Sequence, residues 1–278
     1  MKDLYNEVCY NCSKLVTNHY STSFSLGVSL LHKDFVMPIH AIYGFVRFAD
    51  EIVDTFHDHN KQELLDRFIK DTHDAIGQKI SLNPILQCFQ DTVNKYNIDM
   101  ELIDTFLKSM EMDLDKTKYN QAGYEEYILG SAEVVGLMCL KIFVEGDEKK
   151  YLELKPDARK LGSAFQKINF LRDLKADVHL LGRSYFPGFD PKNFNHETKK
   201  EIEADIQKDF DAGLRGIQQL PRKARLGVYL AYIYYISLFR KIQNTAPEKV
   251  MDTRIRISDS QKYMLFIGSY VKHSLNLI

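Results

Sequence analysis

Two aspartates in the first third of the chain have the spacing to act together on a helix. Asp50 and Asp54 are four residues apart, so their carboxylates share one helix face about one turn from each other. Tyr43 and Arg47 continue this face, and all four side chains fall within an arc of roughly 60°. Like charges at this spacing destabilise an isolated helix by about 0.2–0.5 kcal/mol. The pair therefore predicts a compensating partner, either a divalent cation or a basic side chain.

A solvated acidic face is the alternative interpretation, because acidic pairs at this spacing are common on surface helices. The flanking residues argue against it, since they predict a helix that is buried on nearly all sides. These residues are Ile42, Phe45, Val46, Phe48, Ile52 and Val53. A carboxylate pair on a buried helix needs a partner.

A second pair of aspartates with the same spacing occurs much later in the chain. Asp173 and Asp177 are again four residues apart, and Gly162, Gln166 and Asn169 extend their stripe toward the N-terminus. All five residues lie within an arc of roughly 80°. The rest of this helix is mostly apolar, with Leu161, Phe165, Ile168 and Leu171. A polar stripe inside an apolar helix is hard to explain by solvation.

Two such helices facing each other would present four carboxylates across one cavity. Oxygen-rich clusters of this kind suit Mg²⁺, which keeps several waters and is usually completed by substrate phosphates. We therefore expect a magnesium-diphosphate site, in which a neutralised diphosphate leaves and an allylic carbocation forms in a closed pocket. Neither pair alone would carry this prediction.

The elements that position these residues are predicted to be helices. The chain has only 14 Gly and 7 Pro among 278 residues, and the apolar run 127–144 is too long for a strand. We expect an all-α fold of roughly eight to ten helices in a single domain, residues 1–278. Breaks are expected at Met37-Pro38, Leu82-Asn83-Pro84, Gly146-Asp147, Lys155-Pro156, Phe186-Pro187-Gly188 and Leu220-Pro221.

Composition limits the partners and the compartment. A formal net charge of -1 gives no general attraction to nucleic acid or to an acidic membrane surface. The four cysteines suggest no disulfide framework, and the polar, acidic start does not resemble a signal peptide, so we expect a cytoplasmic protein. Residues 226–239 are nearly uncharged, but about fourteen residues do not span a bilayer, and we predict a buried core helix.

The order of the motifs resembles that of the squalene and phytoene synthases, over about residues 20–262. The matching blocks are Ser21-Thr22-Ser23-Phe24-Ser25, R-x-x-D-E-x-x-D at 47–54, Tyr127 through Val135-Gly136-Leu137-Met138, G-x-x-x-Q-x-x-N-x-x-R-D-x-x-x-D at 162–177, Gly182-Arg183-Ser184-Tyr185-Phe186-Pro187, and finally Arg254 and Lys262. Several motifs in one order make the resemblance specific. It implies an isoprenoid-synthase-type helical bundle around a central cavity, in one domain that joins isoprenoid diphosphates head to head.

The resemblance also implies roles for individual residues. Magnesium and diphosphate binding falls to Asp50, Asp54, Asn169, Asp173 and Asp177. Contacts to a diphosphate or its metal-bound waters fall to Ser21, Ser23, Arg47, Gln166, Asn169 and Arg254. The cavity is lined by Tyr43, Tyr127 and Tyr235, with Tyr127 counted among the catalytic residues together with the four aspartates. Residues 177–186 are expected to form a flap over the site.

Several of these residues have structural interpretations as well. Tyr127 and Tyr235 are alternatively core aromatics, and Ser21 and Ser23 are alternatively helix-cap or turn residues. Arg254 is alternatively a surface partner of Asp252 or Asp259. The chain also departs from the family, because many members have A-G-T-V-G where residues 132–136 read A-E-V-V-G. Glu133 therefore faces either solvent or a neighbouring helix.

The resemblance implies three main reactions. The D-E-I-V-D form of the first motif resembles phytoene synthases, which join two geranylgeranyl diphosphates through prephytoene diphosphate and need no reductant. We therefore expect a phytoene synthase of carotenoid biosynthesis that uses Mg²⁺, with Mn²⁺ as an alternative, and no NADPH. A dehydrosqualene or squalene synthase acting on farnesyl diphosphate is the second choice.

Other classes of protein remain as alternatives. They are a non-catalytic helical assembly or binding protein, a head-to-tail prenyltransferase and a terpene cyclase. The intact aspartates and the Q-x-x-N-x-x-R-D pattern argue against them. We expect a bacterial-type, soluble or peripheral enzyme without the C-terminal membrane anchor of eukaryotic squalene synthases, whose apolar product implies transient contact with the inner face of the membrane. The sequence does not give the oligomeric state.

Overall fold

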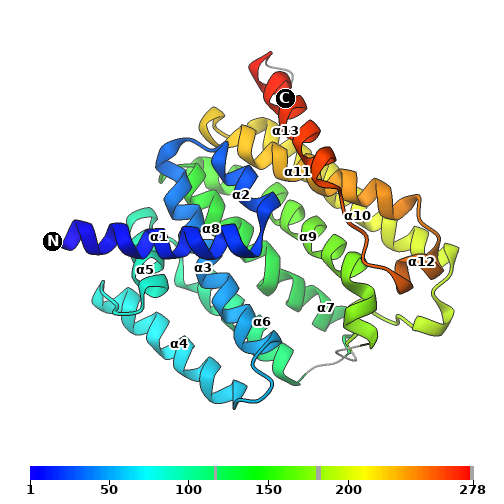
Figure 1. Ribbon diagram of the computed structural model, residues 1–278, viewed down its shortest axis with the longest axis horizontal. Coiled ribbons are helices and arrows are strands. Elements are labelled where there is room, and N and C mark those ends of the chain that lie inside the picture. The colour runs from blue at the N-terminus through cyan, green and yellow to red at the C-terminus, as the bar shows by residue number, and fades with distance from the viewer. Residues whose placement is uncertain (116–117, 180–182, 276–278) are drawn as a thin grey trace.

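The computed structural model describes residues 1–115, 118–179 and 183–275, and these parts of the chain are almost entirely helical (Figure 1). The all-α prediction is confirmed, since their β-structure is limited to one isolated bridge between Lys118 and Ser184. The α-helices are α1 (Lys2–Tyr20), α2 (Thr22–Ser29), α3 (Lys33–Asp54), α4 (Lys61–Gln78), α5 (Pro84–Tyr96), α6 (Met100–Asp115), α7 (Gln121–Ile128), α8 (Val134–Phe143), α9 (Glu148–His179), α10 (His196–Gln219), α11 (Arg222–Gln243), α12 (Pro247–Asp252) and α13 (Asp259–Ser274).

The described residues thus form thirteen α-helices rather than eight to ten. The excess comes from short helices such as α2 and α12, which begin at local signals. Ser21 caps α2 by accepting the backbone N–H of Phe24 at 3.2 Å, and Pro247 occupies the first position of α12.

Two of the expected breaks are wrong. Helix α3 continues through Pro38, and α9 continues through Pro156. A proline in a helix costs about 3 kcal/mol through one lost backbone hydrogen bond and a clash with the preceding turn. Packing of the long helices on both sides outweighs that cost, so a proline alone is a weak indication of a helix end.

The core surrounds α3, which is buried along most of its length. Helices α1 and α5 pack against one side of α3, and α6 and α8 against other sides. Phe45 of α3 stacks on Phe89 of α5 with ring centroids 3.8 Å apart. On the opposite side of the molecule α9 packs along α10, and α11 lies across α2, α9 and α10. Residues 226–239 lie within α11 and are largely buried, as predicted, and no described helix is long and apolar enough to cross a membrane.

A π-helical turn, Leu129–Glu133, joins α7 to α8. The turn packs tightly, because a Cβ on Gly130 would lie 2.5 Å from Ser109 Cβ and 2.7 Å from the carbonyl of Thr105. Glu133 is buried and its Oε2 accepts from Nε of Arg159 at 2.6 Å. Of the two orientations expected for Glu133, the structure therefore selects the one toward a neighbouring helix, α9.

Candidate active site

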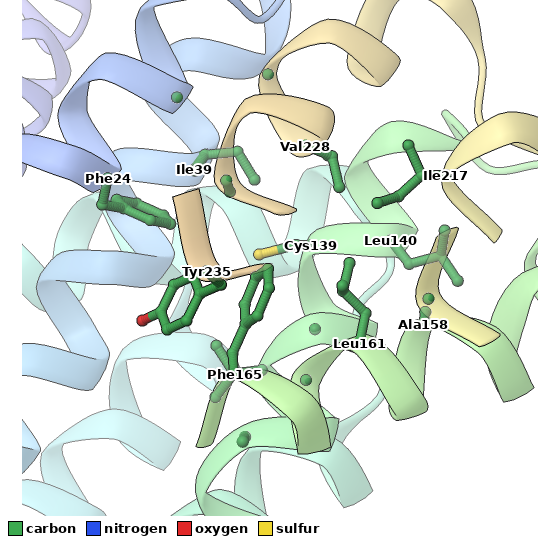
Figure 2. A pocket seen from close by; sticks show the side chains of 18 of the residues that line it. Phe24, Ile39, Cys139, Leu140, Ala158, Leu161, Phe165, Ile217, Val228 and Tyr235 are labelled. Carbon is green, nitrogen blue, oxygen red and sulfur yellow. The ribbon is translucent and has the colours of Figure 1, made fainter. Parts of the chain in front are cut away.

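A cavity of about 410 Å³ lies between α2, α3, α8, α9, α10 and α11. This volume is within the usual range of small-molecule sites. Apolar side chains from all these helices converge on it in Figure 2, with Phe24 and Tyr235 toward one side and Leu140, Ala158 and Ile217 toward the other. The cavity can therefore hold a long apolar ligand.

Helix α9 provides one wall over the whole length of the cavity. Its lining residues recur every three or four positions and include Leu154, Ala158, Leu161, Phe165, Asn169 and Arg172. From Leu154 to Arg172 this stripe extends about 27 Å at 1.5 Å per residue. It is apolar for most of that distance and becomes polar in its last two turns. Asp173 and Asp177 follow Asn169 at one and two turns along the same helix.

Helix α3 repeats this arrangement from the other side. Ile39, Tyr43 and Val46 line the cavity, and the helix continues to Asp50 and Asp54. Both helices therefore change from apolar to acidic in the same chain direction. Their acidic ends meet, because the charge of Asp54 acts on Asp177 across the site.

The structure brings six of the sequence-predicted site residues to the cavity wall. They are Ser21, Ser23, Tyr43, Gln166, Asn169 and Tyr235. Tyr235 donates to Oδ1 of Asn169 at 3.2 Å, and Nδ2 of Asn169 donates to Oε1 of Gln166 at 3.3 Å. The remaining predicted residues lie outside the lining set. They are Arg47, Asp50, Asp54, Tyr127, Asp173, Asp177 and Arg254.

Two carboxylates beyond the polar end, those of Asp50 and Asp177, hold protons more tightly than free carboxylates do. Burial, together with the charge of Asp54, raises the pKa of Asp50 to about 8. Burial, together with the charges of Asp173 and Asp54, raises the pKa of Asp177 to about 7. Repulsion between these neighbouring carboxylates disfavours their charged forms, and a bound cation would reduce that repulsion.

Basic side chains supply part of that charge. Asp173 Oδ2 accepts from Arg172 at 2.5 Å, and Asp173 Oδ1 lies 2.7 Å from Nε of Arg254. Arg254 therefore pairs with a motif aspartate and not with Asp252 or Asp259. Arg47 pairs with Glu51 one turn away, and its guanidinium lies over the ring of Tyr20.

The Nε atom of Arg47 is buried and has no hydrogen-bond partner among the described residues. A buried donor without a partner costs about 1–3 kcal/mol. An anion such as a diphosphate oxygen would satisfy it. The buried donor favours an anion and the carboxylates favour a cation. A diphosphate with its bound metal would satisfy both.

Sequence reasoning missed a buried acid, Asp113 of α6. Its Oδ2 accepts from the Tyr127 hydroxyl at 2.7 Å, and the hydroxyls of Tyr119 and Tyr185 lie 3.4 and 3.5 Å from Oδ1. Burial raises the pKa of Asp113 to about 6, although the Tyr127 hydrogen bond and the charge of Arg183 oppose the rise. Tyr127 is thus a buried aromatic that reaches the acidic cluster through Asp113.

Arg183 connects Asp113 to the first aspartate motif. Its guanidinium donates to Oδ1 of Asp54 at 3.2 Å and to the backbone carbonyl of Asp113 at 2.8 Å. Its own backbone N–H donates to the carbonyl of Asp177 at 2.8 Å. Of the expected flap, residues 180–182 lie outside the described residues, whereas Arg183 contacts residues from both motifs and Asp113.

The donors suit a divalent metal that arrives with its substrate. No three His, Cys, Asp or Glu side chains of the described ranges are grouped closely enough to hold an ion by themselves. Mg²⁺ rarely uses such a cage, because it is usually held by one or two carboxylates, several waters and substrate phosphates. The raised pKa values of Asp50 and Asp177 are what an acidic cluster without its cation should have. The residues present therefore fit the metal.

The family model described as squalene/phytoene synthase matches residues 17–261. The chain belongs to the squalene/phytoene synthase family. Members of this family are prenyltransferases that act on isoprenoid diphosphates and use a divalent metal. The cavity with an acidic end is therefore the candidate active site of this chain.

Named relatives are similar over most of the chain. Phytoene synthase 2 of Solanum lycopersicum is 27% identical over 263 residues, which cover 86% of this chain and 83% of that protein. The phytoene synthase of Arthrospira platensis is 28% identical, covering 77% and 72%, and the 4,4'-diapophytoene synthase of Staphylococcus haemolyticus is 26% identical, covering 72% and 70%. Across four plant phytoene synthase matches, the chain spans 60% to 83% of the relative's length.

The fold is also that of solved members of the family. A dehydrosqualene synthase crystallised with a ligand aligns with a TM-score of 0.82 at 20% identity, covering 97% of this chain and 98% of that one. A squalene synthase from Alicyclobacillus acidocaldarius aligns with a TM-score of 0.76 at 19% identity, covering 87% and 95%. At these identities the likeness shows the fold alone.

Proposed function

We propose that this chain is a phytoene synthase, which joins two geranylgeranyl diphosphates head to head. The observation that carries the proposal is the matched pair of helices α3 and α9, each with cavity-lining residues that lead into an aspartate pair. Long isoprenoid chains would occupy the apolar length, and diphosphates would lie at the acidic end. The relatives named phytoene synthase in a tomato and a cyanobacterium support this member of the family.

The proposed reaction balances without a reductant. In the first half, one C1–O bond breaks, the allylic cation adds to the double bond of the second substrate, and loss of a proton closes a cyclopropane. In the second half, the remaining diphosphate leaves, the skeleton rearranges, and a second proton is lost to form the central double bond. Two diphosphates and two protons leave in total. Squalene would need an added hydride. A requirement for NADPH therefore separates a squalene synthase from the other two reactions, and the length of the substrate separates phytoene synthase from dehydrosqualene synthase.

We assign the metal to Asp50, Asp54, Asp173 and Asp177, with Asn169 as a further ligand. Mg²⁺ bound there, or Mn²⁺ as the alternative, would neutralise the diphosphate and make it a better leaving group. Arg47 and Arg254 would bind diphosphate oxygens, with Ser21, Ser23 and Gln166 as hydrogen-bonding neighbours. Release of Arg254 from Asp173 would accompany binding, since both partners lie where the anion would enter.

The cavity wall would protect the carbocation that remains. Phe24 stacks on Tyr43 and Phe165 on Tyr235, with centroid distances of 4.8 and 4.1 Å. Ring faces attract cations, and an apolar cavity excludes the water that would otherwise quench them. Burial raises the pKa of Tyr43 to about 12, so its hydroxyl stays protonated and available as a donor.

We propose further that residues 1–278 act as one domain, in the cytoplasm, with peripheral contact to the inner face of the membrane. The absence of a membrane-spanning helix from the described residues is compatible with this placement. Release of a hydrocarbon product as insoluble as phytoene requires a nearby apolar phase.

Product analysis tests the function directly. Purified protein with Mg²⁺ is given geranylgeranyl or farnesyl diphosphate, each with and without NADPH. We expect phytoene from the geranylgeranyl substrate, in an amount that NADPH does not change. Dehydrosqualene or squalene from farnesyl diphosphate would replace the proposed substrate while keeping the site. Absence of product from folded protein with either substrate would favour a non-catalytic binding protein.

A further inference from the structure

Helix α13 has a large apolar face that the rest of the protein does not cover. Its outer face, defined here as Tyr263, Met264, Ile267, Tyr270, Val271 and Leu275, is exposed although every one of these side chains is large and apolar. Their spacing places them within an arc of roughly 140°. In Figure 1, α13 lies at the edge of the molecule against α11, and its C-terminal end projects outward.

The inner face of α13 is mixed, because it holds Leu265 and Phe266 together with polar residues. Lys262, Ser269 and His273 turn toward the protein. Ser269 Oγ and His273 Nε2 are buried without a hydrogen-bond partner in the described parts of the chain. A helix beside water normally has charged and polar residues on its outer face. The outer face of α13 therefore fits an apolar phase better than it fits water.

The C-terminal segment that forms α11, α12 and α13 is rich in basic residues, although Lys223 and Arg254 pair with acids outside it. Residues 222–275 contain ten Lys and Arg but only three Asp and Glu, a net charge of +7 in a chain whose total is -1. Lys272 and Arg222 are exposed and form no ion pair within the described ranges. Basic residues that flank an exposed apolar helix face are typical of helices that lie in the surface of an anionic bilayer.

We propose that the outer face of α13 docks the protein on an anionic phospholipid bilayer. A second copy of the chain is a poorer occupant, because a symmetric contact sets the same patch against itself and would bring two strongly positive regions together. An anionic bilayer complements both the apolar side chains and the positive charge.

This docking surface lies beside the candidate active site. Lys262 Nζ lies 3.4 Å from Thr22 Oγ1, and Thr22 sits between two serines that line the cavity. Helix α11, which α13 covers, contributes Tyr234 and Tyr235 to the cavity wall. If the proposed function is correct, docking would place the hydrocarbon product next to the bilayer. Vesicle binding itself does not depend on the reaction.

Flotation with lipid vesicles tests the surface without substrate. The full chain is mixed with vesicles of phosphatidylcholine and phosphatidylglycerol in equal parts, or of phosphatidylcholine alone. We expect binding to the mixed vesicles that weakens as salt is added. Failure of the folded protein to bind mixed vesicles at low salt would overturn the proposal, whether or not the protein makes phytoene.

Two matched variants locate the contact. Ile267→Glu places a charge in the outer face, whereas Leu152→Glu makes a comparable change on α9, and the two side chains are exposed to 61% and 59%. We expect Ile267→Glu to weaken partitioning at least about tenfold and Leu152→Glu to leave it unchanged. Equal effects of the two variants would overturn the assignment to α13.

A third variant and a measurement of size complete the test. Lys272→Ala is expected to weaken binding to mixed vesicles about fivefold, with no effect on neutral ones, since one cation near the surface is worth about 1 kcal/mol. Sedimentation measures whether the apolar face instead joins two copies. A dimer that Ile267→Glu dissociates, with vesicle binding unchanged, would replace the bilayer by a second chain.

Discussion

Neutralising Asp113 should make the protein more stable and less active at neutral pH. Asp113 is buried, with 6% of its surface exposed, and the pKa of its carboxyl is raised from 3.8 to about 6. In the folded chain it therefore binds its proton more tightly than in the unfolded chain. Stability contributed by the protonated acid is lost as the pH rises from about 4 to about 6.

The loss of folding stability can be calculated from the change in the pKa of Asp113. A displacement of about two pKa units corresponds to roughly 3 kcal/mol, of which about half develops between pH 5 and pH 7. Asp113→Asn keeps the shape of the side chain and removes the charge, and Tyr127 can still hydrogen-bond to the amide. The variant should therefore match the wild type near pH 4 and exceed its free energy of unfolding by up to roughly 3 kcal/mol at pH 7.

Activity should change in the opposite direction. Arg183 is shared between Asp113 and Asp54, so without the Asp113 charge it is held more firmly by Asp54, where a metal and a diphosphate would bind. We expect kcat/KM of Asp113→Asn to fall by about tenfold or more, which corresponds to losing one charge-assisted contact. Improved stability with reduced activity would mark Asp113 as a functional residue.

Urea unfolding followed by circular dichroism, without metal or substrate, measures the stability difference across the pH range. Two tyrosine variants serve as matched controls. Tyr127→Phe removes the 2.7 Å bond and should cost about 1.5–3 kcal/mol at pH 7, whereas Tyr119→Phe removes only a 3.4 Å contact and should cost much less. An Asp113→Asn variant that is less stable than the wild type at pH 7, or whose stability difference does not change with pH, would refute the reasoning.

Three further predictions follow from the site. Asp50→Ala and Asp173→Ala should each lower turnover at least about a hundredfold while circular dichroism remains unchanged, and full magnesium-dependent turnover by both would contradict the metal assignment. Mg²⁺ with inorganic diphosphate should raise the thermal unfolding temperature more at pH 8 than at pH 6. The reason is that the carboxyls of Asp50 and Asp177, with pKa values of about 8 and 7, must release protons to bind the metal. Equal increases in unfolding temperature at both pH values, measured by scanning fluorimetry, would contradict this. Ala158→Phe should shift selectivity from geranylgeranyl toward farnesyl diphosphate in a competition assay, since it adds a ring to the apolar end of the cavity, while Leu152→Phe on the exposed side of α9 should not.

The two aspartate motifs could be predicted from the sequence because their signal is local. Helical spacing puts Asp50 with Asp54 and Asp173 with Asp177, and the apolar neighbours indicate that both helices are buried. Composition likewise indicated an all-helical chain. Which side chains share a face of one helix follows from the 3.6-residue repeat, and this can be read directly from the sequence.

The partners of Asp113 could not be predicted, because they lie in distant parts of the chain. Helical spacing separates Asp113 from the other acids of α6 and puts it on the face of Phe106, Ser109 and Met110, so its place on the buried side is a local signal that the sequence analysis did not use. Its partner Arg183 lies seventy residues away in the chain. The orientation of Glu133 was open for the same reason, since only the approach of α9 brings Arg159 to it.

The π turn at Leu129–Glu133 has a consequence for which changes this chain can tolerate. A π turn holds one residue more than the α-helical turn that it replaces, and every residue after it is rotated by about 100° relative to an uninterrupted helix. Val135, Gly136 and Cys139 line the cavity and follow this turn, so the direction of their side chains depends on that rotation. Deleting any one residue here would preserve helicity yet turn α8 so that other side chains face the ligand. In this segment the number of residues is therefore constrained as well as their identities.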